Sequence, residues 1–90
     1  MLTQLYIGRS GDGKMINEHR EQLRTLSNEE IIKAGESARK VGIVGVHAQG
    51  LYLAALWHEM NYRSIECPII IEGEGDGYLQ SGNTITFKED

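Results

Sequence analysis

The chain has 90 residues, of which 40% are hydrophobic and 24% charged, and its formal net charge is −4 at pH 7. This length predicts a single domain, residues 1–90, and the composition excludes a disordered or fibrous chain. No apolar run approaches the ~20 residues that cross a bilayer, so we expect no membrane-spanning segment.

Charge and cysteine content bound the partners and the compartment. Residues 46–90 carry two basic and seven acidic side chains, which argues against nucleic acid and suits a basic protein partner or a solvated acidic face. The one cysteine, Cys67, excludes an internal disulfide. The first residues lack the basic start and long apolar core of a signal peptide. We therefore expect a cytoplasmic protein.

The N-terminal part favours a strand followed by a helix. Residues 2–7 alternate partly in polarity and end at Gly8, which predicts a first strand. Residues 8–13 are rich in glycine and predict a turn. Asn17 can cap a short helix, which we place over residues 17–26.

A second helix, over residues 28–40, has a clear start. Ser27 and Glu30 have the spacing of a capping box, and basic residues in the last turn complement the helix dipole. The predicted inner face consists mostly of small side chains, at Ile31, Ala34, Gly35 and Ala38. Another element can therefore approach this helix closely.

A third helix, over residues 47–62, is predicted to be the core helix. Its apolar residues recur at i, i+3, i+4 and i+7 and form one continuous stripe, which consists of Leu53, Leu56, Trp57 and Met60. Asn61 tolerates the left-handed conformation of a helix end, so we expect the helix to finish near it.

The remainder of the chain favours β-structure. β-branched and aromatic residues predict strands over residues 65–72, 78–80 and 84–87. Residues 81–83 predict a hairpin turn. Pro68 has no N–H to donate, which confines the start of its strand to a sheet edge or a bulge.

Residues 41–46 decide between two folds. As a loop they separate two packed helices beside a terminal sheet, whereas as a strand they start a βαβ unit over residues 41–71 and an α/β fold. The alternation of Val, Ile and Gly allows both. We favour the α+β fold, with helices over about 17–26, 28–40 and 47–62 packed on a small, mainly antiparallel sheet with a C-terminal hairpin.

The turn before the third helix is the candidate ligand site. A helix N-terminus presents free backbone N–H groups and a partial positive charge, both of which attract anions. The residues that could line such a site are Gly45, His47, Gln49 and Gly50. A packing role for the same turn is the alternative.

The segment resembles the dinucleotide-binding βαβ fingerprint. Gly45-x-His47-x-x-Gly50 is similar to G-x-G-x-x-G, and Glu66 lies where such units carry the acid that binds the ribose. The resemblance implies nucleotide binding. An imidazole at the middle glycine position would obstruct the close approach of a pyrophosphate.

The run Gly45-Val46-His47-Ala48 is similar to the phosphorylation motif of the histidine phosphocarrier proteins of the sugar phosphotransferase system. This resemblance implies a phosphohistidine held at a helix N-terminus. Gln49 and Gly50 stand where that family has arginine and proline, so a phosphate partner is missing.

The same region also resembles a helix-turn-helix. Small, apolar and turn residues occupy the positions that this motif requires, at Ala38, Val41, Gly42, Ile43 and Leu51. The resemblance implies DNA binding. The helix that would enter the major groove has no Arg or Lys at its start, although phosphate neutralisation supplies most DNA affinity.

Metal and catalytic motifs are incomplete. His58-Glu59 begins like the zinc-protease motif H-E-x-x-H, but Tyr62 stands at the second histidine position. The acidic run from Glu72 to Gly77 resembles part of a calcium loop and lacks the bidentate glutamate. Cys67 fits a buried core thiol. We predict no metal, no cofactor and no catalytic residue.

These observations favour a small non-catalytic binding or regulatory module over an enzyme. We expect a protein partner or a second copy of the chain, because so short a chain gains stability from association. The predicted contact surfaces are an apolar edge and an acidic tip, formed by Leu53, Trp57, Met60, Glu72, Glu74 and Asp76. The alternatives are phosphate or nucleotide binding at the turn from Gly45 to Gly50, and DNA binding by a helix-turn-helix.

Overall fold

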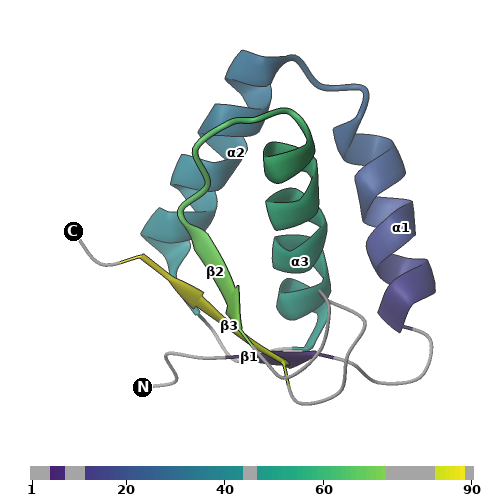
Figure 1. The fold of residues 1–90 in the computed structure, drawn as a ribbon, viewed down its shortest axis with the longest axis vertical. Coiled ribbons are helices and arrows are strands. Elements are labelled where there is room, and N and C mark those ends of the chain that lie inside the picture. Colours follow the sequence, from purple (N-terminus) through teal and green to yellow (C-terminus); the bar gives the residue numbers. More distant parts are fainter. Residues whose placement is uncertain (1–4, 8–11, 44–46, 73–82, 89–90) are drawn as a thin grey trace.

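Three helices pack on a small antiparallel sheet (Figure 1). The computed structural model of the protein describes residues 5–7, 12–43, 47–72 and 83–88. The elements in chain order are β1 (Leu5–Ile7), α1 (Asp12–Leu23), α2 (Asn28–Val41), α3 (His47–Tyr62), β2 (Ile69–Glu72) and β3 (Asn83–Phe87). The predicted α+β fold is confirmed, and the pairing of β2 with β3 fits the predicted C-terminal hairpin.

The sheet has the strand order β1-β3-β2, with β3 in the centre. Ile85 of β3 pairs with Leu5 on one side and with Ile71 on the other, and both pairings are antiparallel. The Lys88 N–H donates to the Pro68 carbonyl at 2.8 Å, which extends the pairing one step beyond β2. Pro68 precedes an edge strand, as its missing N–H predicts.

Helix α3 is the centre of the core. Figure 1 shows it between α1 and α2, with the sheet packed against it. Its buried residues surround most of the helix rather than following one stripe, and they include Leu51, Leu53, Ala54, Ala55, Leu56, Glu59 and Met60. Trp57, predicted to lie in the core stripe, is only half-buried. The stripe was therefore too narrow a description, because neighbours cover this helix on several sides.

Helix α2 begins and ends as local chemistry requires. The Glu30 N–H donates to Ser27 Oγ at 3.2 Å and the Ser27 N–H donates to Glu30 Oε1 at 2.9 Å, so the predicted capping box is confirmed. Val41 is the last helical residue, and Gly42 ends the helix at φ 74° with its N–H on the Ala38 carbonyl. The alternative βαβ unit is thus wrong in starting a strand at Val41; residues 44–46 lie outside the described ranges.

Helix α1 differs from its prediction. It starts at Asp12 instead of Asn17 and ends at Leu23 instead of residue 26, so Asn17 is not its cap. Ile16 and Leu23 are both buried and lie seven residues apart, on one face of the helix. Burial of Ile16 extends the helix through Gly13, because it outweighs the ~1 kcal/mol that a glycine costs there.

The strands are shorter than the sequence predicts. β2 begins at Ile69 rather than at residue 65, since Pro68 cannot donate to a neighbouring strand. Asn83, predicted as a turn residue, is the first residue of β3. Residues 2–4, the predicted strand 78–80 and the turn residues 81–82 lie outside the described part of the chain. Within that part, every helix is too short or too polar to cross a bilayer.

Candidate functional site

The predicted ligand site at the start of α3 is partly used for internal contacts. His47 is the first residue of α3 and Gly50 is buried in it, while Gly45 lies outside the described residues. The Gln49 side chain is half-buried, and its Nε2 donates to the Gly42 carbonyl at 2.6 Å. This bond ties the first turn of α3 to the end of α2. Ligand binding at these residues stays a prediction.

The predicted interaction residues fall into four groups. Leu53 and Met60 are each 1% exposed and belong to the core, whereas Trp57 is half-buried. Glu72 is exposed at the end of β2. Glu74 and Asp76 lie in a segment that the structure does not describe. Among the described members of this set, Met60 borders a cleft beside α2.

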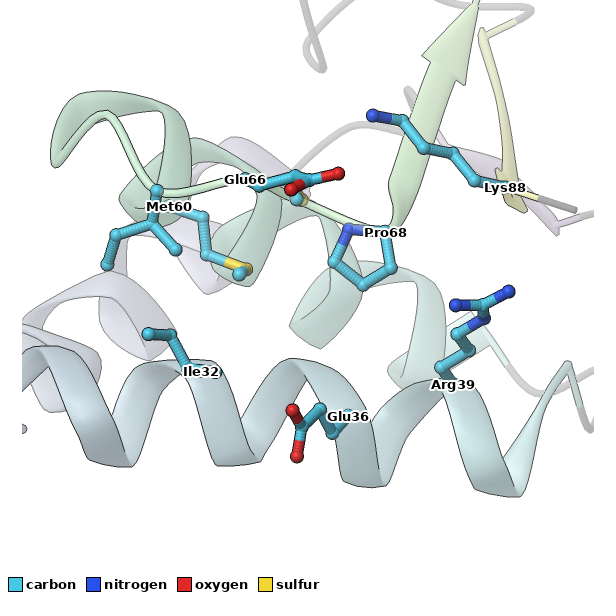
Figure 2. A pocket seen from close by; sticks show the side chains of 9 residues that line it. Ile32, Glu36, Arg39, Met60, Glu66, Pro68 and Lys88 are labelled. Atoms are coloured by element: carbon cyan, nitrogen blue, oxygen red, sulfur yellow. The ribbon is translucent and has the colours of Figure 1, made fainter. Parts of the chain in front are cut away.

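This cleft, of about 480 Å³, lies between α2 and the segment that joins α3 to β2 (Figure 2). We call it the α2 cleft. It is formed by three parts of the chain that the fold brings together: one face of α2, residues 60–68, and the residue after β3. The lining side chains are Ile32, Glu36, Arg39, Met60, Ile65, Glu66, Cys67, Pro68 and Lys88.

The chain turns back sharply after α3, and this turn forms one wall of the α2 cleft. Ser64 has a φ of 58°, in the left-handed region that few non-glycine residues adopt. The Ile65 N–H donates to the Met60 carbonyl at 2.9 Å, which closes the turn. Residues 65–68 then run past α2 toward the sheet (Figure 1).

Gly35 allows this segment to approach α2. A Cβ at this buried glycine would lie 3.3 Å from Met60 Cε and 3.6 Å from Pro68 Cδ. The distance to Met60 is tighter than most Cβ contacts and the distance to Pro68 is an ordinary van der Waals contact, so the small face predicted for α2 is confirmed at Gly35. Met60 and Pro68 therefore pack directly on the helix and form the apolar floor between the charged rims.

The rim of the cleft carries both signs of charge. On α2, Ile32, Glu36 and Arg39 are spaced at i, i+4 and i+7 and share one face of the helix. Figure 2 shows them in this order along one wall. Opposite α2, Figure 2 shows Met60 at the Ile32 end and Glu66 farther along, while the Lys88 side chain extends from the end of β3 with its ammonium pointing away from Arg39.

Cys67 lines the cleft as a buried, unpaired thiol. Burial raises its pKa, and this outweighs the backbone hydrogen bond from Ile69 and the positive charge of Lys88, which act in the opposite direction. The thiol is therefore protonated at neutral pH and is a poor nucleophile. Its contribution to the cleft is apolar packing, as the sequence predicts.

A buried charge cluster lies on the α1 side of α3. The Glu59 side chain is 2% exposed; Arg63 Nε donates to its Oε2 at 2.8 Å, and Arg20 Nη2 lies 3.9 Å from its Oε1. Glu59 Oε1 and Arg20 Nε are buried without a hydrogen-bond partner among the described residues. The cluster thus joins α1 to α3 through one shared carboxylate.

Arg63 extends this cluster to the end of α1 and the start of α2. Its guanidinium donates to the backbone carbonyls of Leu23, Arg24 and Leu26 at 3.2, 3.3 and 2.9 Å. It also donates to Asn28 Oδ1 at 3.1 Å. One side chain therefore satisfies carbonyls that the end of α1 leaves without helical partners. This role is structural.

His58 lies beside the cluster, close enough to Arg20 to feel its charge. Burial lowers its pKa, and the positive charge of Arg20 lowers it further. The imidazole is therefore neutral at pH 7. No group of three or more His, Cys, Asp or Glu side chains in the described residues could hold a metal ion.

Sequence reasoning missed both the α2 cleft and the buried cluster. The signal for the cleft was Ile32, an apolar residue on the otherwise charged outer face of α2. The signal for the cluster was the i, i+4 spacing of Glu59 and Arg63, which favours an ion pair on a helix. Neither pattern shows which distant segment of the chain packs against α2 or against Glu59 in the folded protein.

Comparisons with protein-family models, with curated proteins and with solved structures found no match. The α2 cleft is therefore interpreted from its own geometry and chemistry.

Proposed function

We propose that this domain is a protein-interaction module that holds a segment of a partner protein in the α2 cleft. The observation that carries the proposal is the combination of an apolar floor with a charged rim in one cavity of about 480 Å³. Sites that bind small ligands and side chains commonly enclose about 300–1,000 Å³ and are mainly apolar with a few polar groups. The volume of the α2 cleft lies in this range, and its lining combines five uncharged residues with four charged ones.

Ile32 is the natural anchor point for such a partner. It is 42% exposed at the mouth of the cleft, beside the floor formed by Met60 and Pro68. A single exposed isoleucine is common on protein surfaces, but one next to a concave apolar floor can be covered by a partner's side chain. Complete burial of one Leu or Ile side chain contributes about 1.5–3 kcal/mol. Several charged contacts at the rim would add specificity.

The chemistry of the cleft favours binding over catalysis. The Cys67 thiol has a raised pKa because it is buried, so it lacks the thiolate that a nucleophile needs. The charged groups at the rim, such as Glu36 and Lys88, are exposed and suited to contacts with a partner. We infer that the domain works in the reducing cytoplasm, because its proposed binding site contains an unpaired cysteine.

The alternative functions receive less support. A DNA-reading helix needs an open face, and α3 is covered over most of its surface. The Gln49 amide, which is among the residues predicted to line an anion site, donates to the Gly42 carbonyl. Self-association of the chain stays a prediction, which sedimentation can test.

Selection from a random peptide library tests the proposal, with Ile32→Lys as the cleft variant. Met15→Lys on α1 is the matched control, because Met15 is similarly exposed at 47% and does not line the cleft. We expect peptides that are enriched on the wild-type domain and on Met15→Lys but are lost on Ile32→Lys. Thermal unfolding of both variants shows whether they are folded. Enriched peptides that bind all three domains equally would contradict the proposal, as would a failure to enrich any peptide.

A further inference from the structure

We propose that a second copy of this chain pairs with β2, edge to edge and antiparallel, about a twofold axis at Ile70. The two three-stranded sheets then become one continuous sheet. This interface is separate from the proposed function, because it lies on β2 and its partner is another copy of the same chain. A chain of 90 residues gains stability from such an association.

β2 is an edge strand with backbone groups that face away from the sheet. Among the described strands it pairs with β3 alone. The Lys88 N–H donates to the Pro68 carbonyl, and hydrogen-bonded pairs alternate along an antiparallel ladder. The backbone groups of Ile70 therefore face β3, while those of Ile69 and Ile71 point to the outer edge. A strand edge of this kind is a template for pairing with another strand.

The outward-facing backbone groups of β2 are complementary to those of a second copy. The Ile69 N–H already donates to the Cys67 sulfur, which leaves the Ile69 carbonyl as an acceptor and the Ile71 N–H as a donor. With the axis at Ile70, the Ile71 N–H of each copy meets the Ile69 carbonyl of the other. Two reciprocal hydrogen bonds result. The two Ile70 side chains then face each other in a close pair without hydrogen bonds between their backbones.

The charges at the two ends of β2 favour a second copy as the occupant of this edge. Glu72 is exposed at the end of the strand, and exposed Lys88 lies beside Pro68 at its start. With the proposed axis, the partner's Glu72 lies beside Pro68 on the side opposite Lys88. Strands ~4.8 Å apart place Lys88 and the partner's Glu72 ~10 Å apart at their Cα atoms, which two long side chains can span. Figure 2 shows the Lys88 side chain extending from β3 across the strand that follows Pro68.

A second hollow, of about 350 Å³, borders the edge of β2. It is lined by Ile69, Ile70 and Ile71, whose side chains alternate between the two faces of the strand, so the hollow follows the strand edge. Trp57 and Asn61 of α3 line its other side. Trp57 is half-buried, so an added strand can cover more of its ring. The edge thus offers apolar contacts in addition to backbone hydrogen bonds.

Sedimentation of charge-reversed variants tests this interface. Glu72→Lys and Lys88→Glu each replace two attractive contacts by two repulsive ones, so either variant alone should dimerise about tenfold more weakly than the wild type. A mixture of the two variants restores both attractive contacts, and dimerisation should return. Glu21→Lys is the matched control, because it makes the same charge change at an exposed position of α1. Circular dichroism shows whether each variant is folded.

Amide hydrogen exchange locates the paired strand independently of the variants. The Ile71 N–H should exchange more slowly at high protein concentration than at low concentration. The Ile70 N–H, which faces β3, should be equally protected at both. A wild-type chain that stays monomeric at micromolar concentration would overturn the proposal. A dimer that the charge reversals do not weaken, or an Ile71 exchange rate independent of concentration, would also overturn it.

Discussion

Arg63→Ala should destabilise this protein more than most substitutions of charged residues near its surface. The Arg63 side chain is only 14% exposed and donates hydrogen bonds to five acceptors, among them Glu59 Oε2 at 2.8 Å. Its removal leaves the Glu59 carboxylate, which is 2% exposed, with Arg20 at 3.9 Å as its nearest described cation. Breaking a buried ion pair by removing one partner costs about 3–5 kcal/mol.

The size of this loss makes it easy to measure. A domain of this length has a total stability of about 5–13 kcal/mol, so the variant would lose a large fraction of it. At about 4–8 °C per kcal/mol, the melting temperature should fall by at least ~12 °C. Urea unfolding followed by circular dichroism at low temperature gives the free energy of unfolding. Arg24→Ala is the matched control, because that exposed side chain should change stability by less than about 0.5 kcal/mol.

A double substitution tests the cause of the loss. If the penalty arises from the uncompensated charge of Glu59, then Glu59→Leu combined with Arg63→Leu should be more stable than Arg63→Leu alone. The carbonyls at the end of α1 lose their donor in both proteins, so the difference between them isolates the carboxylate. A loss below about 1 kcal/mol for Arg63→Ala would refute the reasoning. So would a double variant no more stable than the single one.

Four further outcomes can be checked, three of them by urea unfolding and one by sedimentation. Gly35→Val should cost about 1–3 kcal/mol of stability, because the valine side chain would meet Met60. Gly35→Ala should be nearly neutral, because the flexible end of Met60 can move and alanine favours the helix. Urea unfolding that finds the two variants equally stable would contradict this. Ser27→Ala should cost about 1 kcal/mol through loss of the capping box, with Ser37→Ala at an exposed position of α2 as the control outside it. The pKa of His58 is lowered in the folded state, so the unfolded chain binds a proton at this residue more readily. The free energy of unfolding should therefore fall as the pH drops below about 6.5 and through the folded-state pKa. His58→Gln should make the free energy of unfolding depend less on pH between about pH 7.5 and 5. In sedimentation at micromolar concentration we expect an oligomer, and a strictly monomeric species would exclude the predicted self-association.

The fold was predictable where local chemistry decides it. Ser27 and Glu30 mark the start of α2, and the bounds predicted for the third helix are those of α3. Pro68 placed the following strand at an edge. The start of α1 was missed because the burial of Ile16 depends on packing against the rest of the fold, which no local pattern states.

The candidate site was much less predictable. The sequence indicated the turn before α3, where backbone donors can bind an anion, and the structure uses Gln49 of that turn to bond Gly42. The α2 cleft instead depends on residues up to 56 positions apart, from Ile32 to Lys88. Only the tertiary fold places them along one cavity. The small face at Gly35 predicted a close approach, but not that Met60 and Pro68 would make it.

The most direct test of the account is a map of where a selected peptide contacts the domain. Amide chemical shifts of the labelled protein, recorded during titration with a peptide whose binding depends on Ile32, report the contact surface residue by residue. The account predicts the largest changes over residues 32–39 and at residues 65–67, which form the two walls of the α2 cleft. Largest changes on the outer face of α1 around Met15, or in the first turn of α3, would contradict it.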